Sequence, residues 1–294
     1  MTPVRCGLAA LLATIGGIFG LAPAQERKAD PAPAPAPQVP PFEKHADIAY
    51  RTGADADPER NTLDIYTPKG QKDFPVLFFV HGGTWRSGSK KMYVAIGQSF
   101  ARAGIGTVVI NYRLSPKVKH PAHVQDVARA FAWTHANIAK YGGNPDRIVL
   151  FGHSAGGHLV SLLATDPDYL KAEKAPMTAI RGVVSASGVY QIPHEVELFR
   201  PIFGADEEVC QKASPLTHVV GDHPPFLIAY ADQDFPHLDT MAIAMNAALE
   251  KKKSPTRLLK LQDRNHYTII TKVIETADPL NAAIREFVAK ISAK

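Results

Sequence analysis

The stretch that decides the fold reads Leu150-Phe151-Gly152-His153-Ser154-Ala155-Gly156-Gly157-His158. An apolar run that begins at Ile148 leads into it, and a segment compatible with a helix, 157–164, follows it. This order predicts a strand, a sharp turn and a helix, with Ser154 at the apex of the turn. A Cβ at Gly152 or Gly156 would collide with the neighbouring strand or helix, so the turn requires glycine there.

The predicted turn has a chemical consequence. It lifts the Ser154 hydroxyl to the top of a sheet and sets the Ala155 backbone N–H at a helix N-terminus, where it can meet developing negative charge. The G-x-S-x-G pattern alone is a moderate signal, because glycine is a common residue. Its strand–turn–helix context makes the signal specific.

The composition predicts a globular protein without a nucleic-acid partner. The chain has 294 residues, is 45% hydrophobic and carries a formal net charge of +5. Its densest basic cluster, Lys251 to Lys253, falls at a predicted helix end, where cations suit the helix dipole. We therefore interpret this cluster as a solvated helix terminus.

The N-terminal residues have the pattern of an export signal. Arg5 supplies a positive charge, an apolar core spans 8–21, and Ala22-Pro23-Ala24 resembles a cleavage site before Gln25. The apolar run is short for a membrane span, so we expect no stable membrane insertion. Residues 1–24 are thus predicted to be a signal peptide, and the protein to be secreted or periplasmic.

An Ala/Pro-rich linker, 25–41, follows the predicted signal peptide and has no apolar surface to bury. Cleavage would remove Cys6 and leave Cys210 as the sole cysteine, so no internal disulfide is expected. The remaining residues, 42–294, are predicted to form one domain.

Strands and helical crossovers alternate through this domain, which predicts an α/β fold. We expect strands at 48–50, 62–66, 75–80, 106–112, 148–151, 180–186, 226–231 and 257–261, the first two as an antiparallel pair at a sheet edge. We expect helices near 91–103, 123–141, 157–164, 238–252 and 279–291. The result is a mostly parallel sheet with helices on both faces, and its sites gather at the carboxyl ends of the strands.

A second glycine-rich turn, His81-Gly82-Gly83-Thr84-Trp85, is predicted at the same sheet edge. Adjacent glycines let the backbone turn its N–H groups toward a ligand, and acyl transfer needs such donors for its oxyanion. An ordinary Gly-Gly turn is the alternative for this motif taken alone. We expect His81 to shape the loop by hydrogen bonding, and Trp85 to wall the pocket.

A serine nucleophile needs a base, and the base needs an orienting acid. The loop after strand 226–231 offers Asp232 and Asp234, and we favour Asp234 because it lies farther out, before the next helix. The other carboxylate would then cap a turn. His266 follows the last strand and is the favoured base. The resulting chain order is Ser, Asp, His, as a G-x-S-x-G turn predicts.

The remaining histidines are interpreted as surface, core or packing residues. His153 fills the variable position of the serine turn and is expected to border the substrate pocket. His158, one helical turn beyond Ser154, is expected to pack beneath the site. Neither an H-E-x-x-H motif nor a nucleotide-binding glycine loop occurs, so neither a metal nor a cofactor is expected.

These motifs together resemble an α/β-hydrolase of the carboxylesterase, hormone-sensitive-lipase-like branch, and more closely its small esterases and kynurenine-formamidase-like members with H-G-G-x-W. The resemblance spans residues 60 to 270 and rests on the segments 81–85, 111–114, 152–159, 233–236 and 265–267, with Asp126. It implies that Ser154 is the nucleophile, His266 the base and Asp234 the orienting acid. The implied oxyanion donors are Ala155 and one or two amides of Gly82, Gly83 and Thr84, since Thr84 replaces a third glycine.

The expected function is the hydrolysis of small-molecule esters with short acyl groups, because only residues 187–224 could form a lid and no large cap has room. The alternatives within hydrolases are an amide or formamide hydrolase and an acetyl or feruloyl esterase on plant polysaccharide. A non-catalytic binding module is the alternative from another class, although such relatives usually lack a member of the Ser, His, Asp set. The oligomeric state stays open.

Overall fold

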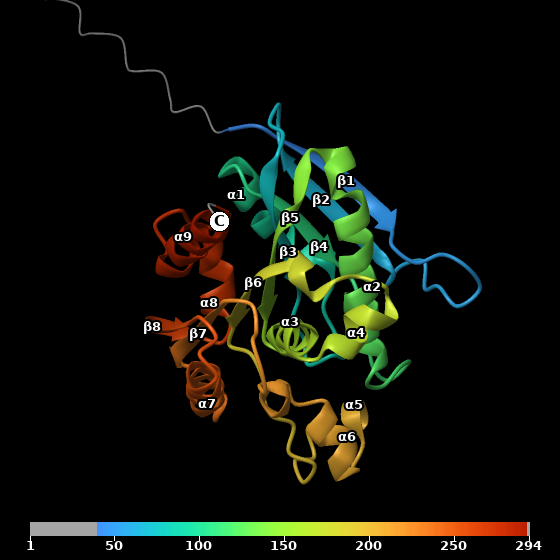
Figure 1. The fold of residues 1–294 in the computed structure, drawn as a ribbon, viewed down its shortest axis with the longest axis vertical. Helices are drawn as coiled ribbons and strands as arrows, with labels where there is room; N and C mark the ends of the chain where they lie inside the picture. Colours follow the sequence, from blue (N-terminus) through green and yellow to red (C-terminus); the bar gives the residue numbers. More distant parts are fainter. Residues whose placement is uncertain (1–39, 293–294) are drawn as a thin grey trace, which may run out of the picture. The chain divides into compact units, whose positions relative to one another are not determined.

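A computed structural model describes residues 40–292, and its strands form one sheet in the order β1-β2-β4-β3-β5-β6-β7-β8 (Figure 1). The predicted signal peptide, 1–24, and nearly all of the predicted linker lie outside the described residues. The strands are β1 (Phe42–Ala49), β2 (Thr62–Pro68), β3 (Phe74–Val80), β4 (Gly106–Ile110), β5 (Gly143–His153), β6 (Ile180–Ala186), β7 (Phe226–Gln233) and β8 (Thr256–Asn265).

The sheet is mostly parallel, as predicted. Strand β1 pairs antiparallel with β2, and β2 pairs antiparallel with β4, while all other neighbours are parallel. Strand β3 is apolar throughout, and β5 is apolar over 148–151, because helices cover both faces of the sheet there. Each predicted strand is present, with ends that differ by a few residues.

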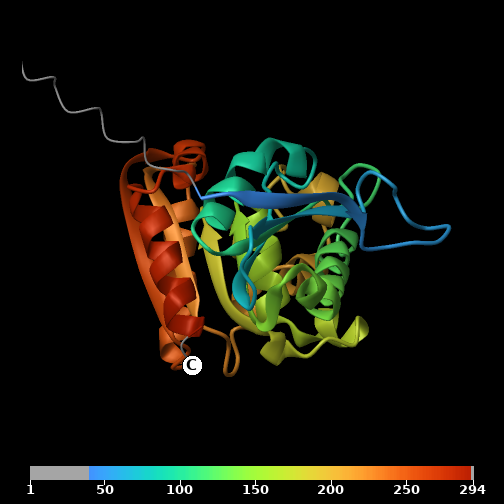
Figure 2. The same cartoon turned by 90° about the horizontal axis from the view of Figure 1, so that it is seen from above.

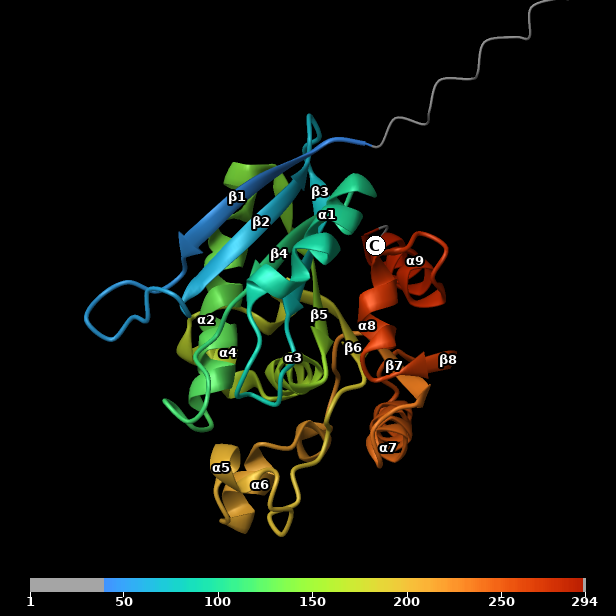
Figure 3. The ribbon, with the colours of Figure 1, turned by 180° about the vertical axis from the view of Figure 1, so that it is seen from behind.

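Helices cover both faces of the sheet and make two separate cores. One core contains side chains of α2 (Ala122–Asn137), α3 (Ala155–Thr165), α4 (Pro167–Ala172) and α7 (Leu238–Lys251). The other contains side chains of α1 (Val94–Arg102), α8 (Thr268–Thr271) and α9 (Pro279–Ser292). Helices α2 and α4 lie toward the viewer in Figure 1, and α1 lies toward the viewer in the reverse view of Figure 3.

Two predicted helices differ from the observed ones. The segment 91–103 begins as a 3₁₀ turn, Lys90–Tyr93, before α1, and buried Lys90 in this turn binds carboxylates of the first two strands. The segment 123–141 ends as a 3₁₀ turn, Ile138–Tyr141, where Gly142 adopts a left-handed conformation with φ 87°. Seen from above in Figure 2, α9 runs along one side of the molecule, apart from α2.

The segment between β6 and β7 forms a small insertion, as expected for residues 187–224. It contains α5 (Arg200–Phe203), α6 (Glu207–Lys212) and a 3₁₀ turn, Pro215–His218. Figure 1 shows α5 and α6 below α3, at the end of the sheet where the parallel strands finish. Of the helices that the structure describes, none has the length and apolar character needed to cross a membrane.

The serine turn is packed as the glycine pattern predicts. A Cβ on Gly156 would lie 2.0 Å from the Val80 carbonyl oxygen, and a Cβ on Gly152 would lie 2.2 Å from the Gly156 oxygen. Both distances are far below van der Waals contact, and the obstructing atoms are backbone. The start of α3 therefore lies directly against the end of β3.

Gly156→Ala should destabilise the fold strongly, because backbone cannot move aside as a side chain can. We expect the free energy of unfolding in urea to fall by about 3 kcal/mol or more, with loss of soluble protein if the variant does not fold. The control is Gly221→Ala, where a Cβ meets nothing within 4 Å and a change below about 0.5 kcal/mol is expected. Equal stability of the two variants would contradict the close packing.

Candidate active site

Ser154 lies alone between two regular elements, after β5 ends at His153 and before α3 begins at Ala155. Its backbone has φ 55° and ψ −120°, a conformation that costs a non-glycine residue about 1–3 kcal/mol. The Ser154 N–H donates to the Ala186 oxygen at 2.9 Å, and its carbonyl accepts from His158 N at 3.0 Å. These bonds and the two tightly packed glycines hold the strained turn.

The structure brings Ser154, His266 and Asp234 into one chain of hydrogen bonds. The Ser154 hydroxyl lies 2.9 Å from His266 Nε2, and His266 Nδ1 lies 2.7 Å from Asp234 Oδ1. An ionised carboxylate only accepts, so Nδ1 carries the proton and Nε2 is free to accept from the hydroxyl. The three residues come from the ends of β5, β8 and β7.

Asp234 is fixed by further donors. The Ser187 hydroxyl donates to Oδ2 at 2.5 Å, and Ala231 N donates to the same oxygen at 3.2 Å. Burial alone would raise the pKa of Asp234, but the hydrogen bonds from His266 and Ser187 outweigh it and lower this pKa below its ordinary value. The carboxylate is thus ionised and aimed at the imidazole.

Sequence reasoning missed Ser187. It follows β6 directly, has φ 48°, and its N–H donates to the Ala229 oxygen at 2.8 Å. A serine at the carboxyl end of a buried strand, on the same edge as Asp234, is the signal that could have suggested a role for it.

Asp232 was expected to cap a turn if it was not the orienting acid, but it lies in β7 and bonds to the neighbouring strand instead. Its Oδ1 accepts from the Arg264 backbone N–H at 2.9 Å, so it links the ends of β7 and β8. It makes no hydrogen bond to His266 among the described contacts. Of the two carboxylates, Asp234 is therefore the one that meets the imidazole.

The 82–84 loop lies directly against the serine turn. A Cβ on Gly82 would lie 2.9 Å from the His153 oxygen and 3.0 Å from Ser154 Cβ, so only glycine permits this approach. Gly83 has φ 116° and Thr84 has φ 51°. The expected oxyanion donors thus belong to two segments, residues 82–84 and Ala155, that meet beside Ser154.

His81 shapes this loop, as expected. Its Nδ1 lies 2.7 Å from the Gly82 oxygen, and the Tyr112 hydroxyl donates to the His81 carbonyl at 3.0 Å. Burial lowers the pKa of His81 to about 4, so the ring is neutral at pH 7 and Nδ1–H is the donor.

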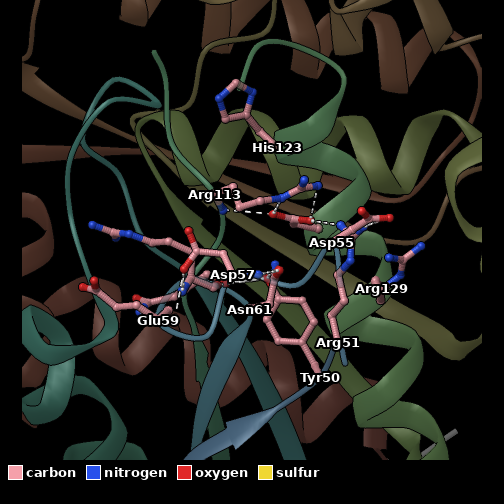
Figure 4. A network of polar contacts seen from close by, with 12 residues as sticks. Tyr50, Arg51, Asp55, Asp57, Glu59, Asn61, Arg113, His123 and Arg129 are labelled. Atoms are coloured by element: carbon pink, nitrogen blue, oxygen red, sulfur yellow. Dashed lines mark hydrogen bonds and ion pairs between the residues drawn. The ribbon is translucent and has the colours of Figure 1, made fainter. Parts of the chain in front are cut away.

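Figure 4 shows a network of polar contacts around Arg113, three residues beyond the end of β4. Buried Asp126 accepts from Arg113 three times, through the backbone N at 2.9 Å and through Nε and Nη2 at 2.8 Å each. Two residues farther on, Ser115 N donates to the Trp85 oxygen at 2.9 Å. The Arg113–Asp126 pair therefore fixes the segment on which the 82–85 loop rests.

Trp85 and His153, expected at the substrate pocket, are only 2% and 4% exposed. Trp85 Nε1 donates to His158 Nδ1 at 3.3 Å, and His153 Nε2 lies 2.8 Å from the His266 backbone oxygen. His158 Nε2 in turn lies 2.7 Å from the Ala213 oxygen of the insertion. These contacts make Trp85, His153 and His158 supports of the site, each held by protein groups.

Several buried histidines of the domain are kept neutral by burial. Burial is the largest cause in each case, and it lowers the pKa to about 4 or about 3 for His81, His120, His123, His153 and His158. Within residues 40–292, no group of three or more His, Cys, Asp or Glu side chains is arranged to hold a metal ion.

Comparison with known proteins places these features in a family. The model of the BD-FAE family matches residues 63–239. Among curated proteins, the chain is 36% identical over 177 residues to "Probable carboxylic ester hydrolase LipM" of Mycobacterium tuberculosis, covering 54% of this chain and 41% of that protein. It is 32% identical over 231 residues to "Esterase LipQ" of the same organism, covering 72% and 54%. The chain thus spans about half the length of these relatives.

Solved structures share the fold. A truncated form of a carbohydrate esterase from gut microbiota superposes with a TM-score of 0.73 at 22% identity, over 88% of this chain and 99% of that one. Esterase B from Lactobacillus Rhamnosis gives 0.72 at 20% identity, over 87% and 88%. The fold is the α/β-hydrolase fold, and the resemblance drawn from the motifs is confirmed.

The buried histidines predict a steep loss of stability in acid. Their folded pKa values lie below the unfolded value near 6.5, so the unfolded state binds more protons as the pH falls from 6.5 toward 4. Each histidine should lower the free energy of unfolding by about 1.4 kcal/mol per pH unit in this range. Urea unfolding between pH 4.5 and 7.5 measures the slope.

A variant isolates one of these groups. His120→Phe keeps the ring contact with Phe203 and the backbone bond to the Ile202 oxygen while it removes the titrating ring. We expect the slope of unfolding free energy against pH to fall by the equivalent of one proton, about 1.4 kcal/mol per pH unit. The exposed Ile243→Ala control should leave this slope unchanged. A free energy of unfolding that stays level from pH 7 to 5 would contradict the neutral state of these rings.

Proposed function

The chain belongs to the BD-FAE family, and from that premise we propose that it is a serine hydrolase of short-chain carboxylic esters. The observation that carries the proposal is the hydrogen-bonded chain from Ser154 through His266 to Asp234. The names of the relatives, carboxylic ester hydrolase and esterase, support the same chemistry.

In the proposed first half-reaction, His266 Nε2 takes the proton of Ser154 as Oγ attacks the ester carbonyl. The carbonyl carbon becomes tetrahedral, and its oxygen takes the negative charge. His266 then gives the proton to the leaving alcohol oxygen, and the acyl group stays on Ser154. The 2.9 Å distance between Oγ and Nε2 suits this transfer.

The oxyanion would be held by the N–H of Ala155 with amides of the 82–84 loop. The close approach of Gly82 to Ser154 supports this assignment, because donors must lie near the attacked carbon. Ala155 is the first residue of α3, so the positive end of the helix dipole adds to the stabilisation.

In the second half-reaction, His266 activates a water that releases the acid and regenerates Ser154. Asp234 keeps the imidazole in the tautomer with the proton on Nδ1 and stabilises the imidazolium formed in each step. Its lowered pKa supports this role, because the group stays ionised where a histidine titrates.

Two features support a short acyl group and an exported protein. The 187–224 insertion holds only short helices, which leaves little surface to enclose a long chain. The charge and apolar pattern of residues 1–24 supports export to the periplasm or the medium. An exported chain should then begin at Gln25, which mass spectrometry of the mature N-terminus tests.

Ser154→Ala removes the proposed nucleophile and should lower kcat/KM for p-nitrophenyl acetate by about four to six orders of magnitude. Labelling by a fluorophosphonate should also disappear, because that probe reacts with an activated serine. Substitution of a single buried hydroxyl leaves the fold intact, which unfolding in urea can check. Wild-type turnover by this variant would refute the mechanism.

The two neighbouring carboxylates provide a matched pair of variants. Asp234→Asn cannot stabilise the imidazolium and permits the wrong tautomer, so kcat should fall by about three to four orders of magnitude. Asp232→Asn removes a carboxylate two residues away that binds Arg264 N, and kcat should stay within about threefold. A larger loss for Asp232→Asn than for Asp234→Asn would reverse the assignment.

A further inference from the structure

Two aromatic side chains flank the candidate base in an exposed position. Among the exposed large hydrophobic side chains of residues 40–292, the aromatic ones are Phe235, which is 48% exposed, and Tyr267, which is 65% exposed. Both contact the ring of His266. The other large aromatic residues in this part of the chain are partly or fully buried.

The three rings form a corner. Phe235 stacks on His266 with ring centroids 4.3 Å apart and an angle of 24° between the planes. Tyr267 stands at 85° to His266 and at 89° to Phe235, with centroids 5.7 Å and 5.8 Å apart. One wall of the corner is therefore parallel to the imidazole, and the other is perpendicular to it.

The backbone holds both walls in place. Phe235 N donates to Asp234 Oδ1 at 2.9 Å, and the Phe235 carbonyl accepts from Leu238 N at 3.2 Å. Tyr267 N donates to Asn265 Oδ1 at 3.0 Å, and the Tyr267 carbonyl accepts from Thr271 N at 3.0 Å. The exposed rings thus extend from ordered turns on either side of the site.

Shielding of the imidazole accounts for only part of this arrangement. One face of Phe235 covers His266, but about half of the side chain faces solvent, and Tyr267 is more exposed still. Exposed aromatic pairs of this kind are typical of surfaces that bind a partner ring, since each ring offers a large apolar face at little entropic cost.

We propose that Phe235 and Tyr267 form a platform for the alcohol half of the ester, and that this alcohol carries a ring with a flat apolar face. An aryl ring and the C–H face of a pyranose share this chemistry. The inference rests on the proposed ester hydrolysis and adds to it the class of leaving group.

The position of the proton donor assigns the platform to the alcohol. His266 Nε2 must reach the leaving oxygen to protonate it, so the group on that oxygen lies beside the imidazole and its two aromatic neighbours. The carbonyl oxygen faces Ala155 and the 82–84 loop, and the acyl group occupies the remaining position on the reacting carbon. The aromatic side chain that follows this loop, Trp85, is buried against Phe199 and Phe203 and is not exposed to a ligand ring.

Two isomeric esters test the alcohol half and the acyl half of the substrate separately. Benzyl acetate carries its ring on the alcohol, and methyl phenylacetate carries the same ring on the acyl group. Ethyl acetate and methyl acetate are the respective references without a ring. The quantity compared is the ratio of kcat/KM for the ring ester to that for its reference, so the intrinsic reactivity of each ester cancels between wild type and variant.

Phe235→Ala and Tyr267→Ala should each lower the benzyl acetate ratio about three- to tenfold, which is the range expected for loss of one aromatic contact. The methyl phenylacetate ratio should change less than twofold. Phe235→Tyr and Tyr267→Phe, which keep the rings, should restore the benzyl acetate ratio. Ile243→Ala, a change at a side chain as exposed as Phe235 but on α7, should leave both ratios unchanged.

A methyl xylopyranoside monoacetate distinguishes the two sources of the ring. Its kcat/KM is again divided by that of ethyl acetate. A drop in this ratio in the alanine variants supports a sugar alcohol, and a drop confined to the benzyl acetate ratio supports an aryl alcohol. Ratios unchanged for both substrates would overturn the platform, and so would a loss confined to methyl phenylacetate. Failure of the proposed function is seen separately, as ethyl acetate turnover that survives Ser154→Ala.

Discussion

The contact on which this molecule depends is the one between Gly156 and the carbonyl of Val80. It brings the first turn of α3 against the end of β3 with no side chain between them. One consequence is the strained backbone of Ser154, which the helix and strand hold from both sides. Another is that the loop leaving β3 must pass directly beside the serine, where Gly82 makes a second contact without a side chain. Two glycine contacts thus set the distance between the hydroxyl and the loop of candidate oxyanion donors.

Charge and hydrogen bonding orient the side chains that this packing brings together. Asp234 is an ionised acceptor held by Ser187 and the backbone, so the proton of His266 is directed to Nδ1 and the free Nε2 faces Ser154. The histidines below the site are neutral because burial disfavours their charged forms. A cationic ring at His153, whose centroid lies 4.8 Å from that of His266, would repel the imidazolium that the proposed mechanism forms at His266. Burial of His153 avoids this repulsion.

The sequence predicted the strands and the serine turn because both follow from local patterns, apolar runs and glycines at fixed offsets. The preference for Asp234 over Asp232 rested on their places in one loop, and the structure gives each carboxylate a distinct partner. The position of Ser187 at the end of a strand could have suggested a role, but its contact with Asp234 could not be predicted, because that contact arises from the pairing of β6 with β7 and from a left-handed backbone at Ser187. The burial of Trp85 was also beyond the sequence, since it depends on where Phe199 and Phe203 of the insertion settle.

The contact between His158 and Ala213 has a consequence for how this fold could diversify. Because His158 belongs to α3, the helix that starts beside Ser154, its hydrogen bond to the Ala213 oxygen ties the 187–224 insertion to the core of the fold. This contact fixes one point of the insertion relative to the helix that carries the site. Substitutions of side chains on the insertion could therefore reshape the surface beside the site without disturbing this contact. A longer insertion that displaced Ala213 would first have to break the hydrogen bond to His158.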